Sequence, residues 1–327
     1  MKDAEWGLLT RIPLKAELYG RETYFREGLA DTVELMCPEM LWPIALLLIK
    51  PDGLLTGKSP AILRFLRENG FSVVAVEQPV LTGFHWREMW RYQLNCSTTD
   101  RLLVNDLVLP GQALLLILRL ERDLDVPASV WLSGLKGPSD VSAQSPQCLR
   151  RLLKQPNRIL SFFHVADEPA DVIRELAILL DTAGRRRVLA ACMKGDLSDA
   201  DREVLNRAVE TAQREIRSPD SQPALARAED ALRGRDETPA ARQIRVDLAR
   251  MRRGECIAWA PFARAIAAAE INLDRWDLAV LGAQFVVCDE PGKVKQIKGV
   301  DPSLWSGRKP LPSSVVSLQA GLPVPDA

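Results

Sequence analysis

Residues 158–180 read RILSFFHVADEPADVIRELAILL. The first part of this stretch is an apolar run typical of a buried strand, and His164 follows it directly. The Asp-Glu-Pro sequence that comes next is typical of the first turn of a helix, where acidic side chains and proline are both favoured. We therefore predict a strand over residues 158–163 and a helix from Asp167 to about Leu180.

Three further apolar runs of strand length occur upstream, at residues 42–49, 71–76 and 113–118. Apolar residues with helical spacing follow the first run over residues 59–69 and the second run over residues 83–94. The strands are separated by too few crossover helices for a doubly wound parallel sheet. We therefore predict an α+β fold, a ferredoxin-like α/β sandwich whose four-stranded antiparallel sheet carries helices on one face.

The composition changes near residue 182, where helical patterns rich in Ala, Arg, Leu and acidic residues replace the alternation of strands and helices. A chain of 327 residues is long enough for two domains of ordinary size. We divide it into a lead-in (residues 1–41), the α+β domain (42–182), a mostly α-helical domain (183–310) and an irregular tail (311–327).

The charges of the chain balance, because 43 Lys and Arg residues face 43 Asp and Glu residues. Proteins that bind nucleic acid or anionic lipid through bulk charge carry a basic surplus, so nucleic acid is an unlikely partner unless arginines form a local patch. No apolar run approaches the length of a membrane helix, and the N-terminus shows no signal peptide. The six cysteines form no CxxC pair and there are only two histidines, so we expect a cytoplasmic protein without a Cys/His zinc site.

Two positions at strand ends have the chemistry of a phosphate site. His164 lies at the end of its strand, and Glu175 follows eleven residues later in the next helix. A carboxylate that holds one imidazole nitrogen leaves the other nitrogen free as a nucleophile. Lys50 ends the first strand and precedes Pro-Asp-Gly, where its ammonium can meet a phosphate. Taken singly, a strand-end histidine or lysine is more often structural than functional.

Several short motifs occur in one order along residues 42–182. They are IKPDGLLTG, GFSVVAVE, LPGQALLLILRL, GLKGPSD, SPQCLRR and ILSFFHVADEPADVIREL. In sequence and spacing this segment resembles the nucleoside diphosphate kinase family. The resemblance implies transfer of a phosphoryl group from ATP or another nucleoside triphosphate to a histidine, and then to an acceptor diphosphate. It also implies Mg²⁺ held mainly through the nucleotide phosphates, and a homo-oligomer.

The resemblance assigns a role to each candidate residue. His164 falls on the histidine that becomes phosphorylated, and Glu175 falls on the acid that orients it. Lys50 and Arg150 fall on residues that bind phosphate. Lys136 stands at the position of a phosphate-binding threonine. These assignments imply phosphoryl transfer by a positioned nucleophile with cations on the phosphate oxygens.

Other positions depart from the family pattern. Ser161 stands at the position of an asparagine that contacts the nucleotide, and Val130 stands at the position of a phosphate-binding arginine. Leu102–Leu103 lies in the region of the aromatic residue that stacks on the base. Trp90 replaces a tyrosine near the histidine, unless that tyrosine has shifted to Tyr92. Each lost arginine contact costs about 1.5–3 kcal/mol of binding free energy. Two readings stay open: a phosphotransferase with altered nucleotide or acceptor specificity, and a catalytically impaired nucleotide sensor or scaffold whose helical region binds a protein partner.

Overall fold

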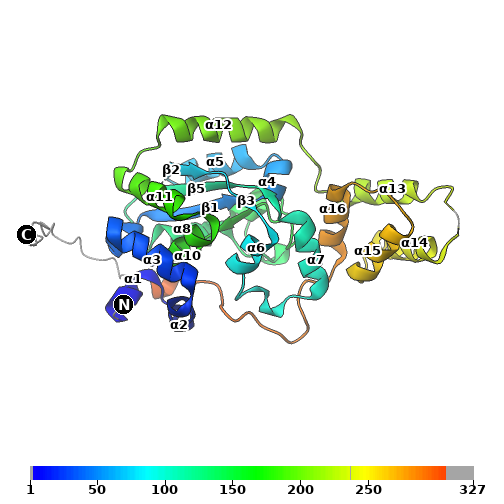
Figure 1. The fold of residues 1–327 in the computed structure, drawn as a ribbon, viewed down its shortest axis with the longest axis horizontal. Helices are drawn as coiled ribbons and strands as arrows, with labels where there is room; N and C mark the ends of the chain where they lie inside the picture. Colours follow the sequence, from blue (N-terminus) through cyan, green and yellow to red (C-terminus); the bar gives the residue numbers. More distant parts are fainter. Residues whose placement is uncertain (1–2, 236, 307–327) are drawn as a thin grey trace, which may run out of the picture.

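A four-stranded antiparallel sheet forms the centre of the protein (Figure 1). The computed structural model describes residues 3–235 and 237–306. The strand order is β2-β5-β1-β6, with β1 at Ile44–Ile49, β2 at Phe71–Glu77, β5 at Leu114–Leu120 and β6 at Phe163–Val165. A two-stranded ribbon joins β3 (Val80–Leu81) and β4 (Gly111–Gln112). The predicted α+β fold with a four-stranded antiparallel sheet is therefore confirmed.

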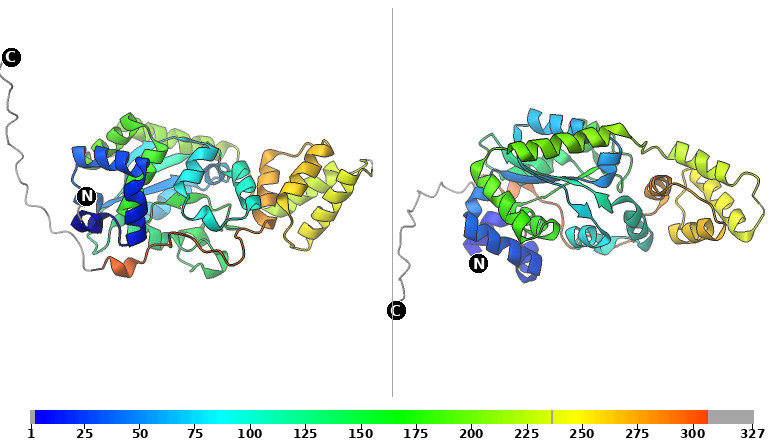
Figure 2. Two further views of the ribbon diagram at one scale, coloured as in Figure 1. Left: turned by 60° about the horizontal axis from the view of Figure 1, so that its bottom comes forward. Right: turned by 45° about the horizontal axis from the view of Figure 1, so that its top comes forward.

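Helices cover both faces of the sheet, so the prediction of helices on one face is wrong. The side chains of β1 alternate between two apolar clusters, and every one of them is buried. One cluster includes residues of α5 (Ser59–Glu68), α8 (Ala128–Lys136) and α12 (Asp199–Arg214), and the other includes residues of α6 (Gly83–Met89), α10 (Pro169–Leu179) and α11 (Thr182–Lys194). Figures 1 and 2 show this sandwich. Continuous apolar runs such as ALLLI are what a strand buried on both faces requires.

The predicted strand at residues 158–163 is wrong in position, because β6 begins only at Phe163. The preceding residues form an irregular segment in which Phe162 has a φ of 66°. The backbone N–H of Phe162 donates to Oδ2 of Asp52 at 2.9 Å, and its carbonyl accepts from the backbone of Lys50 at 2.9 Å. Ile159 and Leu160 are instead buried in the helical cluster described below. Apolarity alone could not distinguish this burial from that of a strand.

The N-terminal lead-in is helical and packs on the sheet domain. It contains α1 (Asp3–Leu9), α2 (Pro13–Arg21), α3 (Thr23–Leu35) and the 3₁₀ turn η1 (Pro38–Leu41). Helix α3 lies against α10, and Gly28 allows this close approach. A Cβ atom at Gly28 would lie 2.6 Å from the carbonyl oxygen of Ile173. The lead-in thus supports the helix that carries Glu175.

A third apolar cluster, which we call the helical cluster, joins the C-terminal helices to the sheet domain. It contains residues of α7 (Thr99–Val108), α13 (Ser221–Ala231), α14 (Pro239–Arg252), α15 (Trp259–Ala268) and α16 (Arg275–Phe285). In contrast, α11 and α12 pack against β2. The domain boundary at residue 183 remains a prediction, and residues 311–327 of the predicted tail lie outside the described residues. No helix in the described part of the chain is long and apolar enough to cross a membrane.

The chain after α16 runs back along the sheet domain towards the N-terminal helices (Figures 1 and 2). We call residues 286–301 the return segment; the 3₁₀ turn η4 (Pro302–Leu304) follows it. Ile297 is buried in a cluster with Leu9 and Tyr92, and the backbone N–H of Gln296 donates to the carbonyl of Tyr92 at 3.0 Å. The segment is therefore anchored along its length.

Candidate functional site

A cleft of about 560 Å³ opens beside the ends of β1 and β6. Its walls come from α7, α8, α9 (Leu149–Leu152), the residues that follow α6, and the return segment. Lys50, which precedes the short helix α4 (Pro51–Leu55), also lines it. Of the predicted site residues, Lys50, Lys136, Arg150, Ser161 and His164 all line this cleft. The remaining one, Glu175, is buried and contacts the ring of His164. The fold therefore brings together all six residues.

The imidazole of His164 is held by a neighbour at each nitrogen. Nε2 lies 2.8 Å from Oε1 of Glu175, and Nδ1 lies 3.1 Å from the indole nitrogen of Trp90. An indole nitrogen can only donate, so Nδ1 must be the acceptor and Nε2 must carry the proton. Trp90 is thus the aromatic residue near the histidine, whereas the hydroxyl of Tyr92 donates to Glu22 at 2.5 Å.

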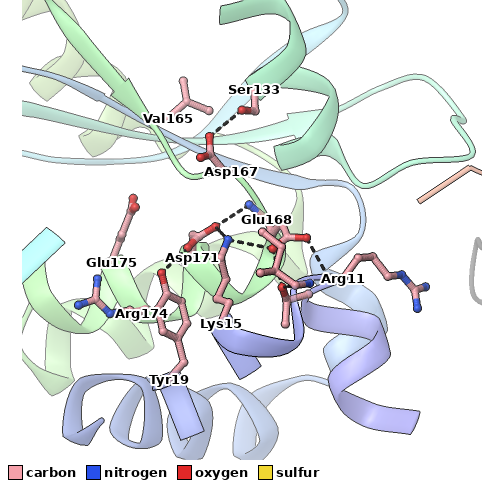
Figure 3. A network of polar contacts seen from close by, with 12 residues as sticks. Arg11, Lys15, Tyr19, Ser133, Val165, Asp167, Glu168, Asp171, Arg174 and Glu175 are labelled. Atoms are coloured by element: carbon pink, nitrogen blue, oxygen red, sulfur yellow. Dashed lines mark hydrogen bonds and ion pairs between the residues drawn. The ribbon is translucent and has the colours of Figure 1, made fainter. Parts of the chain in front are cut away.

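The positions of His164 and Glu175 follow from local structure. His164 lies opposite Leu48 in the antiparallel pairing of β1 with β6. Glu175 lies in α10, whose first turn is tied to the lead-in by buried polar contacts (Figure 3). Burial raises the pKa of Glu175, and the contact with His164 opposes this rise. Its carboxylate therefore depends on the histidine as a hydrogen-bond partner.

Lys50 is almost completely buried, although it lines the cleft. Its Nζ lies 3.4 Å from Oδ2 of Asp52 and donates to the carbonyl of Ile159 at 3.3 Å. Burial lowers the pKa of Lys50, and the charge of Asp52 opposes this effect. Because these contacts are long, the ammonium retains capacity to bind an anion in the cleft.

Arg150 has unused donor capacity. One terminal nitrogen donates to the carbonyl of Gly137 at 2.8 Å, and within the described residues its buried Nε has no hydrogen-bond partner. Burial lowers the pKa of Arg150 to about 10, so it remains charged at neutral pH. A half-buried guanidinium with a free N–H is a natural donor for phosphate oxygens.

Lys136 is already paired inside the protein. Its Nζ lies 2.6 Å from Oδ1 of Asp167, and the hydroxyl of Ser133 donates to the same oxygen at 2.6 Å. Burial alone would raise the pKa of Asp167, but the charge of Lys136 lowers it well below its usual value. Lys136 therefore balances Asp167 first, and its contribution to a bound phosphate is smaller than its position in the sequence implied.

Three cations of the cleft were not predicted from the sequence. They are Arg101 from α7, Arg158 from the irregular segment before β6, and Lys295 from the return segment. Arg158 opens the stretch quoted at the outset, where we assigned it to a strand. Arg101 precedes the Leu102–Leu103 pair, where we looked only for an aromatic. Nothing local marks Lys295, because the return segment reaches the cleft only through the tertiary fold.

The departures from the family pattern have structural counterparts. Leu102 packs against the helical cluster and Leu103 is exposed, and neither lines the cleft. Val130 is buried against Trp42 and Trp305. Among the described residues, positions 102, 103 and 130 therefore contribute neither an aromatic nor a cationic side chain to the cleft.

The donor set of the cleft does not form a metal site of the protein's own. Asp167 is the one acidic side chain among the described residues that line the cleft, and it is engaged by Lys136. The described part of the chain also contains no group of three or more His, Cys, Asp or Glu side chains suited to holding a metal ion. A divalent cation such as Mg²⁺ prefers several oxygen ligands, so its coordination here would have to come from a bound phosphate chain.

No protein-family model matches the sequence, and a search of curated proteins finds no match. Among solved structures, the protein is similar to the nucleoside diphosphate kinase of Aquifex aeolicus, with 19% identity over 43% of this chain and 96% of that chain and a TM-score of 0.35. A halophilic nucleoside diphosphate kinase from Halobacterium salinarum in complex with CDP is 17% identical over 43% of this chain and 89% of its own, with a TM-score of 0.35.

An NDP kinase from Pyrobaculum aerophilum is 14% identical over 43% of this chain and 97% of its own, with a TM-score of 0.33. The chain thus contains a segment similar to these kinases, in keeping with the resemblance of residues 42–182. Because the sequence identities are below 20%, the function of the cleft has to be inferred from its own residues.

Proposed function

We propose that the cleft binds a nucleoside triphosphate and transfers its terminal phosphoryl group to Nδ1 of His164. One observation carries the proposal: Glu175 holds the proton on Nε2, which leaves an unprotonated Nδ1 beside a cleft lined with cations. Lys50 and Arg150 would neutralise the charge on the phosphate oxygens during transfer. The most sharply defined part of the site is therefore a nucleophile suited to phosphoryl transfer.

In the proposed step, the lone pair of Nδ1 attacks the terminal phosphorus. The bond from that phosphorus to the bridging oxygen breaks, and a nucleoside diphosphate leaves with the electron pair. The proton on Nε2 stays in its hydrogen bond to Glu175, which stabilises the positive charge that develops on the ring. The indole N–H of Trp90 must first move away from Nδ1. Mg²⁺ would enter with the nucleotide, and an anionic acceptor would later take the phosphoryl group.

Intact-mass analysis after incubation with Mg²⁺ and each nucleoside triphosphate tests this step. We expect an adduct of one phosphoryl group that is labile in acid, as a phosphohistidine is. The chain offers a matched control because it has two histidines. The adduct should be lost in His164→Asn and retained in His85→Asn, since His85 lies in the exposed capping box of α6. An adduct that survives in His164→Asn would overturn the assignment.

The second candidate function is nucleotide binding without transfer, in a sensor or scaffold. The Trp90 contact favours it, because this hydrogen bond occupies the lone pair that would attack. Calorimetric binding of a nucleotide without any adduct, in both the wild-type protein and Trp90→Phe, would select this function. The C-terminal helices would then be the place to seek a protein partner. With either function, we propose that the protein is a cytoplasmic homo-oligomer. Light scattering of the purified protein tests the oligomeric state.

A further inference from the structure

Three basic side chains meet at the wall of the cleft that α7 and the return segment form. We call Arg101, Arg158 and Lys295 the distal subsite. The carboxylate of Asp289 bridges its two arginines: Oδ1 lies 2.7 Å from a terminal nitrogen of Arg101, and Oδ2 lies 2.7 Å from a terminal nitrogen of Arg158. Asp289 belongs to the return segment, so residues distant in the sequence build this arrangement.

The distal subsite carries more positive than negative charge. Partial desolvation and the charges of Arg158 and Arg101 lower the pKa of Lys295. Desolvation alone would raise the pKa of Asp289, but its hydrogen bond with Arg158 and the charge of Arg101 lower it. The buried Nε of Arg101 has no hydrogen-bond partner within the described residues. The carboxylate of Asp289 thus faces three cationic side chains, and Arg101 keeps a donor with which it can bind an anion.

We propose that the distal subsite binds a phosphate group, and that Asp289 occupies it until a ligand phosphate displaces the carboxylate. A carboxylate that bridges two guanidinium groups offers negative charge and two acceptor oxygens, and two oxygens of a phosphate group can accept from the same donors. The return segment therefore supplies both a ligand-binding cation, Lys295, and an internal competitor, Asp289.

The ligand is a linear phosphate chain that reaches both groups of cations. Lys50 and Arg150 line the same cleft as the distal subsite, and the charge of Arg101 lowers the pKa of Lys50 as well as that of Lys295, so the two groups of cations are electrostatically coupled. Among the described residues that line the cleft, the aromatic side chains are Trp90 and Phe163, both beside His164. The distal wall is thus suited to anions rather than to an aromatic base. This inference extends the proposed function, but it rests on binding and does not require transfer.

Isothermal titration of inorganic tripolyphosphate and of ATP tests the subsite in a His164→Asn background, where no phosphohistidine can form. Asp289→Asn removes the competing charge and should tighten tripolyphosphate binding about tenfold, within the usual range of coupling between two sites. Lys295→Met should weaken it about tenfold. Lys298→Met, a matched change in the same segment outside the cleft lining, should leave it unchanged.

The two ligands distinguish the sources of the phosphate chain. Tighter binding of both ligands in Asp289→Asn supports a subsite that recognises the phosphate chain alone. Tighter binding of ATP but not of tripolyphosphate supports a subsite that requires the whole nucleotide. Unchanged or weaker binding of both ligands in Asp289→Asn would overturn the displacement, because Asp289 would then merely brace the arginines. Equal affinities in Lys295→Met and Lys298→Met would overturn the subsite itself.

A second measurement needs no variant of the return segment. The backbone N–H of Glu290 donates to the carbonyl of Cys96 at 2.7 Å, beside the bridge between Ser97 and Asp289. If a ligand phosphate displaces Asp289, saturating tripolyphosphate should accelerate amide hydrogen exchange in residues 288–292 of the otherwise unchanged chain. Slower or unchanged exchange in that peptide would contradict displacement. A failure of phosphohistidine formation would leave these binding and exchange results standing.

Discussion

The indole nitrogen of Trp90 lies 3.1 Å from Nδ1 of His164, while Glu175 holds Nε2 of the same ring at 2.8 Å. The two rings also meet edge to face, with centroids 5.4 Å apart. Glu175 orients the imidazole ring and keeps the ring's proton on Nε2, whereas the indole N–H of Trp90 occupies the lone pair of Nδ1 that a nucleophile needs. In this conformation the ring of His164 is therefore oriented, but its acceptor nitrogen is occupied by the indole N–H of Trp90.

Removing this indole donor should make His164 more reactive. Trp90→Phe keeps an aromatic ring but loses the N–H, and one neutral hydrogen bond is worth about 1 kcal/mol of free energy. We expect carbethoxylation of His164 by diethyl pyrocarbonate to become roughly fivefold faster at neutral pH. Peptide mass mapping over time measures the rate at each histidine separately.

His85 provides an internal reference in the same experiment. It lies in the capping box of α6 with Thr82, away from the changed contact, so its rate should be the same in both proteins. An equal acceleration at both histidines would indicate a general loosening of the structure. No acceleration at His164 would show that the Trp90 hydrogen bond does not limit access to Nδ1.

The stability of the protein should depend on pH through Glu175. Burial raises the pKa of Glu175 above its ordinary value of 4.5, so the folded state holds this proton at pH values where the unfolded state has released it. The free energy of unfolding contributed by this group is therefore largest below pH 4.5 and falls as the pH rises through the folded-state pKa. Glu175→Gln lacks this dependence.

We expect the wild-type protein to lose stability relative to Glu175→Gln as the pH increases from about 4.5 towards neutrality. Urea denaturation at several pH values measures this difference. Glu203→Gln changes an exposed glutamate of α12 and is the matched control, with a flat difference from the wild type. A difference that grows with pH in favour of the wild type would reverse the sign and contradict a raised pKa.

The sequence singled out six candidate residues that the structure brings together, but it did not predict the layers around them. His164 and Lys50 could be singled out because each directly follows an apolar run, and Glu175 because it lies eleven residues after the histidine in the next helix. In the structure His164 lies within β6 rather than at the end of its strand, opposite Leu48 of β1. The strand before His164 could not be placed, because the apolar pair Ile159 and Leu160 is buried in the helical cluster, and a hydrogen bond to Asp52 bends the chain there. A buried strand and a buried irregular segment have the same apolar composition, so the sequence pattern does not distinguish them.

The distal cations show a second limit. Lys295 reaches the cleft only because Ile297 and Gln296 anchor the return segment beside Tyr92. Such long-range placement leaves no periodicity or spacing in the local sequence. Similarly, no pattern in the lead-in indicates that Lys15 contacts the N-terminal end of the helix that carries Glu175.

The ion pairs between the lead-in and α10 should be essential for stability. Nζ of Lys15 lies 2.8 Å from Glu168 and 2.7 Å from Asp171, and all three side chains are buried (Figure 3). Burial alone would lower the pKa of Lys15, but Asp171 and Glu168 raise it, so the lysine stays charged. Lys15→Met leaves two buried carboxylates without their cation. We expect a loss of about 3–5 kcal/mol in the free energy of unfolding, measured by urea denaturation.

Two comparisons separate this effect from a general effect of charge. Arg21→Ala removes an exposed pair with Glu17 in the same helix and should cost less than about 1 kcal/mol. Adding Glu168→Gln and Asp171→Asn to Lys15→Met should recover part of the stability, because the uncompensated charges are gone. A Lys15→Met protein as stable as Arg21→Ala would show that the carboxylates find other partners.

Arg150 should dominate the binding of phosphate in the cleft. Its side chain is half-buried, its buried Nε has no hydrogen-bond partner within the described residues, and its Gly137 contact uses one terminal nitrogen. Arg150→Met removes these donors, and a hydrogen bond to a charged group is worth about 1.5–3 kcal/mol. We therefore expect ATP to bind about 10-fold to 100-fold more weakly, as measured by isothermal titration in the His164→Asn background.

The next residue in the chain is the control for that measurement. Arg151 follows in the same short helix but is exposed and does not line the cleft, so Arg151→Met removes an equal charge without removing a cleft donor. Its ATP affinity should match that of the parent protein apart from a small long-range effect that disappears as salt is added. Similar losses in both variants would mean that the cleft attracts nucleotide by net charge alone. A loss confined to Arg150→Met would mean that the cleft binds phosphate through specific donors rather than through net charge.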